Sequence, residues 1–308
     1  MRGVSSPQQS PVEHLSTPVD GVAVVGSLSP RGGGDFTTCP LLYRFRSIDR
    51  LPEPPSPDAA RGTVVHRVLE RLFDLPAAQR TPAQALALVE PSWQEVREAE
   101  PELAAMFAAD GADRQGRELE PWLASCRRVL ERYFTLEDPR RLEPADREVY
   151  VESVLDSKLL LRGIVDRIDV APDGAVRLVD YKTGKAPREG YEGAALFQLR
   201  FYALVVWRTR GVVPAMLKLV YLGSGEVITY EPDEQDLRAT ERKVEAIWRA
   251  IGEAEESGEW LPRRGPLCGW CAHQALCPAW GGTPPPLPDP VSASGDEPAA
   301  ADQTVVRA

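Results

Sequence analysis

No stretch of 18 or more consecutive apolar residues occurs in this sequence of 308 residues, so no membrane-spanning helix is expected. The N-terminus also lacks a basic region followed by an apolar run, so no secretory signal is expected and the cytoplasm is the default location. There are only five cysteines, which in a reducing compartment argue against a disulfide framework. A G-x-x-x-x-G-K-[ST] motif is missing, so a nucleotide-driven motor within the chain is not expected.

An excess of positive charge is also absent. The net charge is −10 and the sequence pI is about 5.0, so the chain as a whole lacks the excess of basic residues that is typical of nucleic-acid-binding proteins. Binding depends on local fields, however, and basic residues do gather in places. Taken singly, each such group most often lies on a solvent-exposed surface and has no binding role. The groups are Arg44, Arg46 and Arg50; Arg61, Arg67 and Arg71; Lys182, Lys185 and Arg188; and Arg263 with Arg264.

What is present is ordinary globular composition, with 43% hydrophobic and 27% charged residues. Residues 1–25 are polar and residues 283–308 lack a core-forming pattern, so both are expected to be disordered tails. One folded domain is therefore predicted over residues 26–282. It would include a helical insertion at 82–140 and a cysteine-bearing segment at 260–280.

The order of apolar patterns along the chain predicts a mixed β-sheet flanked by helices, an α/β (α+β) fold. Helical spacing is seen at 61–74, 82–136, 194–211 and 233–257, and strand patterns at 147–155, 158–170, 175–183, 215–222 and 226–232.

One predicted hairpin, residues 161–185, carries unexpected charge. Pro172-Asp173-Gly174 suits a three-residue loop, so Ala171 should pair with Ala175. In that register Asp166 lies directly opposite Asp180. Alternation adds Ile164, Ile168, Val176, Leu178 and Lys182 to the face of the two acids, and it puts Arg167, Asp169, Arg177 and Tyr181 on the other, wetter face.

The two facing carboxylates would have Cβ atoms about 5 Å apart on an apolar face. Such a like-charge pair is costly unless it is compensated. A Mg²⁺ or Mn²⁺ ion, which prefers oxygen ligands, would compensate it. Lys182 points the same way and could reach a phosphate. The plainer alternative is a structural Asp–Lys pair at a sheet edge.

Other polar residues could join this site. His66 lies on the first predicted helix, where a lone histidine is most often a surface or cap residue. Gln198 and Tyr202 share a helix face at i and i+4, which alone means little. Glu148 and Glu152, on the strand before the hairpin, could supply another carboxylate, with weak support.

Together these segments resemble the RecB-type nucleases of the PD-(D/E)xK superfamily. The resemblance covers roughly residues 27–280, and its six motifs are specific in their order rather than singly. They are CPLLYRFR, GTVVHRVLE, GIVDRID, VDYKTGK, QLRFY and CGWCAHQALCP. The initial "PD" of the superfamily is reduced here to Val165-Asp166, which keeps the acid.

The resemblance implies a restriction-endonuclease-like fold and assigns roles by position. His66, Asp166 and Asp180 would bind the metal, with the backbone carbonyl of Tyr181 completing the set. Lys182 would be the lysine of the D-x-K motif and stabilise charge or orient water. Gln198 and Tyr202 would lie near the site and the DNA backbone.

The cysteines form a second pattern, with Cys268, Cys271 and Cys277 close together and Cys39 far upstream. The resemblance supplies their grouping, because AddB-type and CRISPR-adaptation members show this one-plus-three arrangement around a 4Fe-4S cluster. Four thiolates fit such a cluster, and a Cys₄ zinc site is the rival. The cluster would join both ends of the domain, so a structural role is expected. Cys126 is expected to lie in a helix core.

The function expected from the resemblance is a metal-dependent DNA nuclease, an exonuclease in repair or recombination. DNA with single-stranded regions or free ends would be its partner, with a helicase supplied in trans if one is needed. One alternative is a module that keeps the fold and binds DNA without cutting. Another is a nuclease that trims spacer precursors in CRISPR adaptation.

Overall fold

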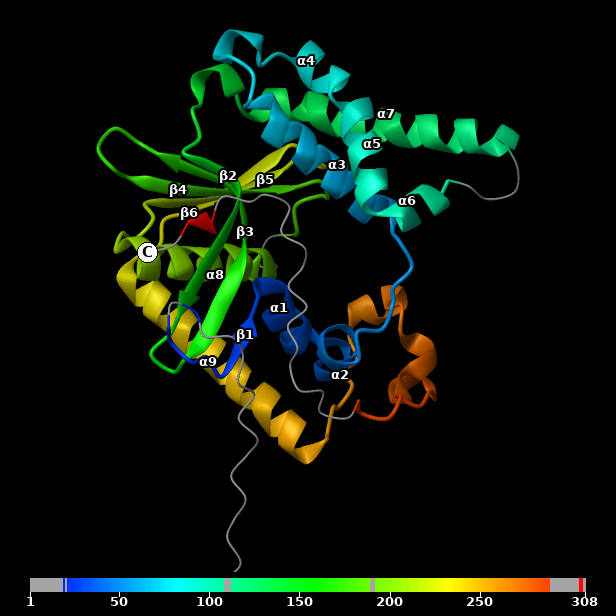
Figure 1. Ribbon diagram of the computed structural model, residues 1–308, viewed down its shortest axis with the longest axis vertical. Coiled ribbons are helices and arrows are strands. Elements are labelled where there is room, and N and C mark those ends of the chain that lie inside the picture. Colours follow the sequence, from blue (N-terminus) through cyan, green and yellow to red (C-terminus); the bar gives the residue numbers. More distant parts are fainter. Residues whose placement is uncertain (1–18, 20, 108–111, 189–191, 289–304, 307–308) are drawn as a thin grey trace, which may run out of the picture.

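The fold is a mixed sheet with helices on both faces (Figure 1). It is seen in a computed structural model that describes residues 19, 21–107, 112–188, 192–288 and 305–306. The predicted fold class is thereby confirmed. The expected tails lie largely outside the described residues, and their described parts include the two-residue strand β7. Among the helices that the structure describes, none is long and apolar enough to span a bilayer.

The sheet has the strand order β6-β5-β4-β3-β2-β7, and β1 pairs with β3 beside this path. The pairs β2–β3, β3–β4 and β5–β6 are antiparallel, while β4–β5, β1–β3 and β2–β7 are parallel. The strands are β1 (Gly26–Leu28), β2 (Asp146–Val154), β3 (Leu159–Val170), β4 (Val176–Lys182), β5 (Met216–Tyr221), β6 (Glu226–Tyr230) and β7 (Val305–Val306).

The strand β3 is paired unevenly along its two edges. Strand β2 follows one edge from Leu160 to Ile168. On the other edge β1 pairs with residues 159–161 and β4 with residues 167–170. Between these partners, residues 162–166 have no strand on that edge among the described residues, and Asp166 lies at the end of this open stretch.

The hairpin of β3 and β4 has the predicted register. Ala171 donates its backbone N–H to the carbonyl of Ala175 at 2.9 Å, and the ladder continues to Arg167 opposite Val179. Gly174 has φ +87°, the left-handed conformation that glycine adopts without strain. Asp166 and Asp180 would form the next pair, but the ladder ends before them.

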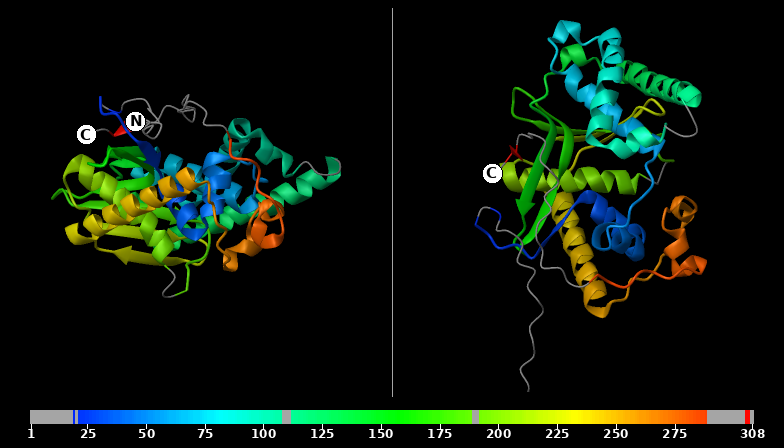
Figure 2. Two further views of the ribbon diagram at one scale, coloured as in Figure 1. Left: turned by 90° about the horizontal axis from the view of Figure 1, so that it is seen from below. Right: turned by 45° about the vertical axis from the view of Figure 1, so that its right-hand side comes forward.

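The helices form two layers, and each layer has its own hydrophobic core (Figure 2). The sheet face toward α1, α8 and α9 has one core. The strands β4 and β5 meet α3, α5 and α7 in the other, the helical-layer core. The α-helices are α1 (Pro30–Thr38), α2 (Pro40–Tyr43), α3 (Pro57–Leu72), α4 (Pro82–Ala87), α5 (Val89–Ala99), α6 (Pro101–Ala105), α7 (Ala112–Leu136), α8 (Gly193–Arg210) and α9 (Glu234–Ser257). Short helical turns are π-helical η1 (Arg44–Ile48) and 3-10 turns η2 (Ala77–Gln79), η3 (Pro139–Arg141), η4 (Pro266–Trp270), η5 (Gln274–Leu276) and η6 (Pro278–Trp280).

Local sequence explains where the main helices begin and end. Ser56 caps α3 by accepting the N–H of Ala59, and Pro57 occupies the first turn. Asp233 and Asp236 form a reciprocal capping box at the start of α9. Gly211 follows α8 and Gly258 follows α9, both with positive φ, as is common after a helix.

The prediction that the face with Arg167 and Tyr181 is the wetter face of the hairpin is wrong for these two residues. Tyr181 is 4% exposed and Arg167 is 1% exposed. The helical layer of α3, α5 and α7 covers this face, and Tyr181 belongs to its core. Ile164, expected on the apolar face, is instead 38% exposed, whereas Val165 is buried with Ile168. The alternation of buried side chains therefore changes phase where β3 parts from β4.

Candidate active site

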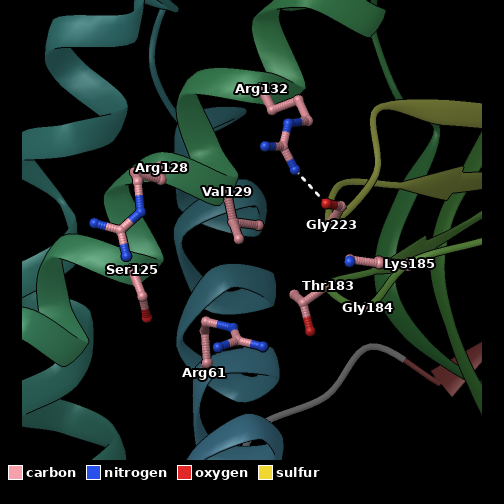
Figure 3. Close-up of a pocket in the computed structure, with 9 residues that line it drawn as sticks. All are labelled: Arg61, Ser125, Arg128, Val129, Arg132, Thr183, Gly184, Lys185 and Gly223. Atoms are coloured by element: carbon pink, nitrogen blue, oxygen red, sulfur yellow. Dashed lines mark hydrogen bonds between the residues drawn. The ribbon is translucent and has the colours of Figure 1, made fainter.

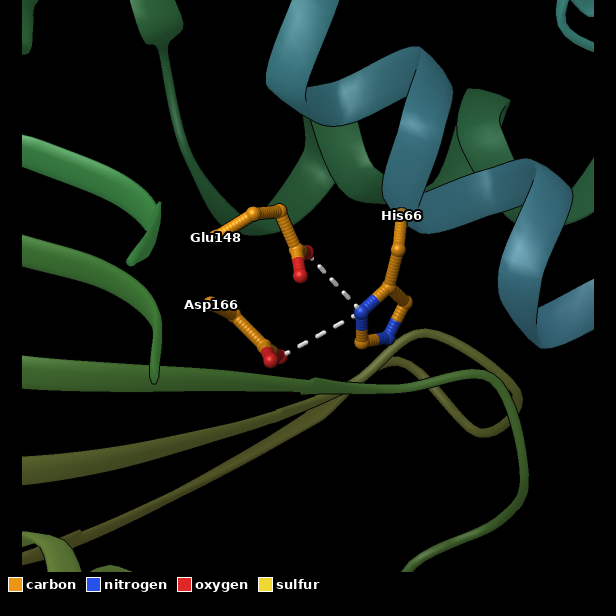
Figure 4. A group of neighbouring side chains, drawn as sticks. All are labelled: His66, Glu148 and Asp166. Carbon is orange, nitrogen blue, oxygen red and sulfur yellow. Dashed lines mark hydrogen bonds and ion pairs between the residues drawn. The ribbon is translucent and has the colours of Figure 1, made fainter. Parts of the chain in front are cut away.

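The imidazole of His66 points from α3 toward the strands β2, β3 and β4 (Figure 4). The helix is anchored by Val65, Val68 and Leu69, which are buried in the helical-layer core. The Nε2 atom of His66 lies 2.9 Å from the carbonyl oxygen of Tyr181. Its Nδ1 atom lies 3.3 Å from Oε1 of Glu148 and 3.6 Å from Oδ2 of Asp166.

Two carboxylates face this imidazole because of the pairing between β2 and β3. Arg147 pairs with Arg167 and Val149 with Val165, so Glu148 lies across from Asp166. Glu148 has φ +42°, an uncommon backbone conformation for a non-glycine residue and one that recurs at functional sites.

The three side chains could share one ion. Ligand atoms of His66, Glu148 and Asp166 all lie within 4.8 Å of one another. Neighbouring ligands of an octahedral Mg²⁺ or Mn²⁺ are about 3 Å apart, given metal–ligand bonds of about 2.1 Å. The separations of 3.3 and 3.6 Å from the imidazole are close to that value. The group thus fits a divalent cation by donor type and by spacing.

The backbone of Tyr181 joins the imidazole to Asp166. Its N–H donates to Oδ2 of Asp166 at 2.7 Å, and its carbonyl accepts from His66. The Asp166 side chain therefore bonds β4 at the point where the β3–β4 ladder ends. Tyr181 therefore lies beside the candidate ion site through its backbone.

The remaining predicted residues form a chain of contacts next to the imidazole. Nζ of Lys182 lies 2.8 Å from Oδ2 of Asp180 and donates to Oε1 of Gln198 at 2.7 Å. Nε2 of Gln198 donates to the hydroxyl of Tyr202 at 3.2 Å. The Tyr202 ring packs on Gly163, where a Cβ would come within 2.6 Å of the ring.

The two acids that the resemblance assigns to the metal, Asp166 and Asp180, have different partners in the structure. Asp180, 2% exposed, lies against Lys182 and is not part of the cluster of His66, Glu148 and Asp166. Glu148, which the sequence supported only weakly, is part of it. Glu152 lies outside the cluster and accepts a hydrogen bond from the hydroxyl of Tyr150.

Burial and charge shift the acid–base properties of these groups. Burial raises the pKa of Asp180 to about 6, the nearby Asp166 carboxylate adds to this, and Lys182 opposes it. Burial also raises the pKa of Asp166, against the effect of His66. For His66, burial lowers the pKa, but Asp166, Glu148 and Asp180 outweigh it and raise the pKa to about 10. Without a bound cation, the imidazolium therefore offsets part of the negative charge of these carboxylates.

This charge pairing predicts a pH dependence for the metal-free protein. The pKa of His66 is raised from 6.5 to about 10, so its contribution to stability is complete below pH 6.5 and is lost as the pH rises toward 10. With a chelator present, the melting temperature of the wild type should fall more steeply over this interval than that of His66→Gln. Parallel profiles for the two proteins would contradict the pairing.

An open cleft of about 560 Å³ adjoins these residues. His66, Tyr181 and Lys182 lie along it, together with the Thr183–Lys185 loop. A substrate entering the cleft would meet both the imidazole and the amine.

The cysteine-bearing C-terminal segment docks onto the N-terminal helices (Figure 2). Sγ of Cys39 accepts the backbone N–H of Arg263 at 3.3 Å, and Sγ of Cys268 lies 3.9 Å from the carbonyl of the same residue. The buried imidazole of His273 anchors the segment through Glu53 at 3.0 Å. Cys126, as predicted, is buried in the helical-layer core.

The positions of the cysteine sulfurs bear on the choice of metal. Sulfur ligands of a tetrahedral zinc ion are about 3.8 Å apart, given zinc–sulfur bonds of about 2.3 Å. Among the described residues, no three cysteine sulfurs lie within 4.8 Å of one another. The sulfurs are therefore not arranged as in a closed zinc site, although Cys39 and Cys268 both contact Arg263.

Three comparisons place the chain among known proteins. The family model described as the PD-(D/E)XK nuclease superfamily matches residues 27–278. The "Gene 69 protein" of Mycobacterium phage D29 is 28% identical over 192 residues, which are 58% of this chain and 67% of that protein. The crystal structure of a "Putative exonuclease" from Eubacterium rectale superposes with a TM-score of 0.52 at 16% identity, covering 80% of this chain and 87% of that one. At this identity the superposition shows a shared fold alone.

Proposed function

This chain belongs to the PD-(D/E)XK nuclease superfamily, and from that premise we propose that it is a metal-dependent deoxyribonuclease acting on DNA ends in repair or recombination. The observation that carries the proposal is the meeting of His66, Glu148 and Asp166, together with the position of His66 and Lys182 on the lining of the cleft. The exonuclease assignment is supported by the description of the Eubacterium rectale protein, which shares the fold. A helicase acting in trans would supply single strands.

His66, Glu148 and Asp166 would hold the divalent ion, with the Tyr181 carbonyl next to them. When bound, such an ion lowers the pKa of a coordinated water and polarises the phosphate. The chain itself fixes the ligands, because the Tyr181 N–H orients Asp166 and α3 orients the imidazole. Asp180 would hold the amine of Lys182 in place and contribute negative charge at the site.

Lys182 would stabilise the negative charge that develops on the phosphate as the ester bond breaks. Its ammonium group is held between Asp180 and Gln198, so it is oriented before the substrate arrives. Gln198 and Tyr202 would act as positioning residues for this amine and for the DNA backbone.

Lys182→Ala should lower kcat about 10²-fold with little change in stability, because one electrostatic contact to the transition state is lost. Asp180 has a pKa of about 6, so without the amine it can take up a proton and remain buried as a neutral acid. Steady-state kinetics and a melting curve check this. A loss of activity matched by a large fall in melting temperature would contradict a direct role in cleavage.

We also propose that Cys39, Cys268, Cys271 and Cys277 hold a 4Fe-4S cluster, as in AddB-type nucleases. The support is the docking of the two cysteine-bearing segments on each other through Arg263, and a donor set of four thiols. The role of the cluster would be to fasten the C-terminal segment to α1 and α2.

An anaerobic preparation tests both proposals. Iron and sulfide analysis of the protein should find the cluster, and Cys271→Ser should lose it. The same protein should degrade 5′- and 3′-end-labelled DNA with Mn²⁺ or Mg²⁺, whereas Asp180→Ala should not. Intact DNA after incubation with loaded wild-type protein would overturn the nuclease proposal, and an iron-free preparation would overturn the cluster.

A further inference from the structure

A second cavity, of about 270 Å³, is lined by the residues drawn in Figure 3. It is formed by α3, α7, the loop after β4 and the turn between β5 and β6. The two cavities share the loop residues Thr183, Gly184 and Lys185. A group bound in the second cavity would therefore lie next to a substrate in the cleft.

The lining of this cavity is basic although the chain as a whole is acidic. It includes Arg61, Arg128, Arg132 and Lys185, and no Asp or Glu. Asp58 contacts Arg61 at 2.8 Å from an exposed position outside the lining. Nη1 of Arg132 donates to the carbonyl of Leu222 at 2.9 Å, a neutral partner that leaves the positive charge of the guanidinium in place.

The two cations nearest to solvent are unpaired within the part of the chain that the structure describes. Arg128 and Lys185 are exposed, and no described carboxylate lies within ion-pair distance of either. The Nε atom of Arg61 is buried and has no hydrogen-bond partner there either. The cavity thus holds donors and positive charge that an anion could satisfy.

The wall of the cavity is held by a close backbone contact. Gly223 donates its N–H to the carbonyl of Gly184 at 3.0 Å. A Cβ at Gly223 would lie 2.2 Å from that carbonyl oxygen, so a larger residue would separate the turn from the loop. The loop that carries Lys185 is therefore fixed in position relative to the turn between β5 and β6.

We propose that this cavity binds a second phosphate group of the DNA strand whose scissile phosphate lies in the cleft. The identity of the ligand rests on the proposed function. Guanidinium groups match phosphate oxygens with paired hydrogen bonds, and the absence of acids from the lining favours an anion. The bound group is either an internal phosphate or a terminal one, which have the same chemistry.

The test is the binding of a short fluorescein-labelled oligothymidylate, measured by anisotropy in a chelator so that no cleavage occurs. The double variant Arg128→Gln/Lys185→Gln should bind about ten-fold more weakly at moderate salt. The slope of log Kd against log salt should fall by about 1.4, or about 0.7 for each lost phosphate contact. Arg127→Gln is the matched control, because Arg127 is on the same helix and pairs with Glu120 outside the cavity.

Oligonucleotides with and without a 5′-phosphate distinguish binding of an internal phosphate from binding of a terminal one. A loss of affinity for both supports an internal phosphate, and a loss only for the phosphorylated one supports a terminal phosphate. Unchanged affinity and slope for both would overturn the inference, even if the wild type cuts DNA. Weakened binding in a protein that proves unable to cut DNA would instead leave the subsite standing and remove the nuclease proposal.

Discussion

Glu148→Gln should lower the rate of metal-dependent DNA cleavage about 10³-fold, which corresponds to about 4 kcal/mol of transition-state stabilisation. The substitution keeps the size of the side chain and removes its charge. Glu148 lies 3.3 Å from the imidazole of His66 and belongs to the group that fits an ion. Cleavage rates and calorimetric Mn²⁺ titration would both report the loss.

The matched control is Glu152→Gln, four residues further along β2. Its carboxylate accepts a hydrogen bond from Tyr150 and is outside the cluster around His66. Cleavage and Mn²⁺ affinity should remain near the wild-type values. If Glu148→Gln behaves like this control, Glu148 does not hold the ion.

Glu137→Gln should lower the free energy of unfolding by about 3–5 kcal/mol, the usual cost of breaking a buried ion pair from one side. The Glu137 carboxylate accepts two hydrogen bonds from Arg167, at 2.8 and 3.1 Å, and one from Lys218 at 2.5 Å. The side chains of Arg167 and Glu137 are only 1% and 4% exposed. Without this anion, Lys218 loses its carboxylate partner and, among the described residues, Arg167 keeps only that of Asp169, at 3.1 Å. Denaturant titration measures the loss.

The difference in stability between the wild type and Glu137→Gln should depend on pH. Burial raises the pKa of Glu137, but Arg167 and Lys218 outweigh it and leave the pKa below its usual value of 4.5. The folded state therefore favours the ionised carboxylate of Glu137. This contribution to the free energy of unfolding is fully present above pH 4.5 and is lost as the pH falls through the lowered pKa. The difference in free energy of unfolding between the wild type and Glu137→Gln should therefore become smaller as the pH falls below 4.5.

Asp138→Asn is the control for Glu137→Gln. Asp138 is the next residue and pairs with Arg140 at 2.9 Å, but on the surface. Since exposed ion pairs contribute little, its loss should have a much smaller effect. Equal destabilisation by both substitutions would contradict the importance of burial at Glu137.

The hairpin could be predicted from the sequence because its information is local. Pro172 and Gly174 define the turn, and the turn defines the register of both strands. The i and i+4 spacing of Gln198 and Tyr202 likewise places them on one face of α8, where they contact each other. These features depend only on nearby residues.

Glu148 was harder to predict, because its position depends on a less regular turn. The turn before β3 has no glycine, and Lys158 adopts φ +64° there. The pairing of β2 with β3 could therefore not be read from turn chemistry, although it places Glu148 opposite Asp166. Counting residues from a correctly assigned turn would have found it.

Contacts between distant segments escaped prediction for a similar reason. The burial of Tyr181 and Arg167 depends on helices that precede them by many residues. The basic cavity combines Arg61, Arg128 and Lys185, which lie in three separate regions of the sequence. Grouping charges by sequence neighbours cannot reveal such a cavity.

The candidate site is assembled from both hydrophobic cores, and this has a consequence for how heat inactivates the protein. His66 is carried by a helix packed in one core, while the neighbours of Glu148 and Asp166, Val149 and Val165, are packed in the other. Loosening of the helical layer alone would withdraw the imidazole while the strands stay paired. Thermal inactivation would then precede the melting of β-structure, and the two midpoints would differ.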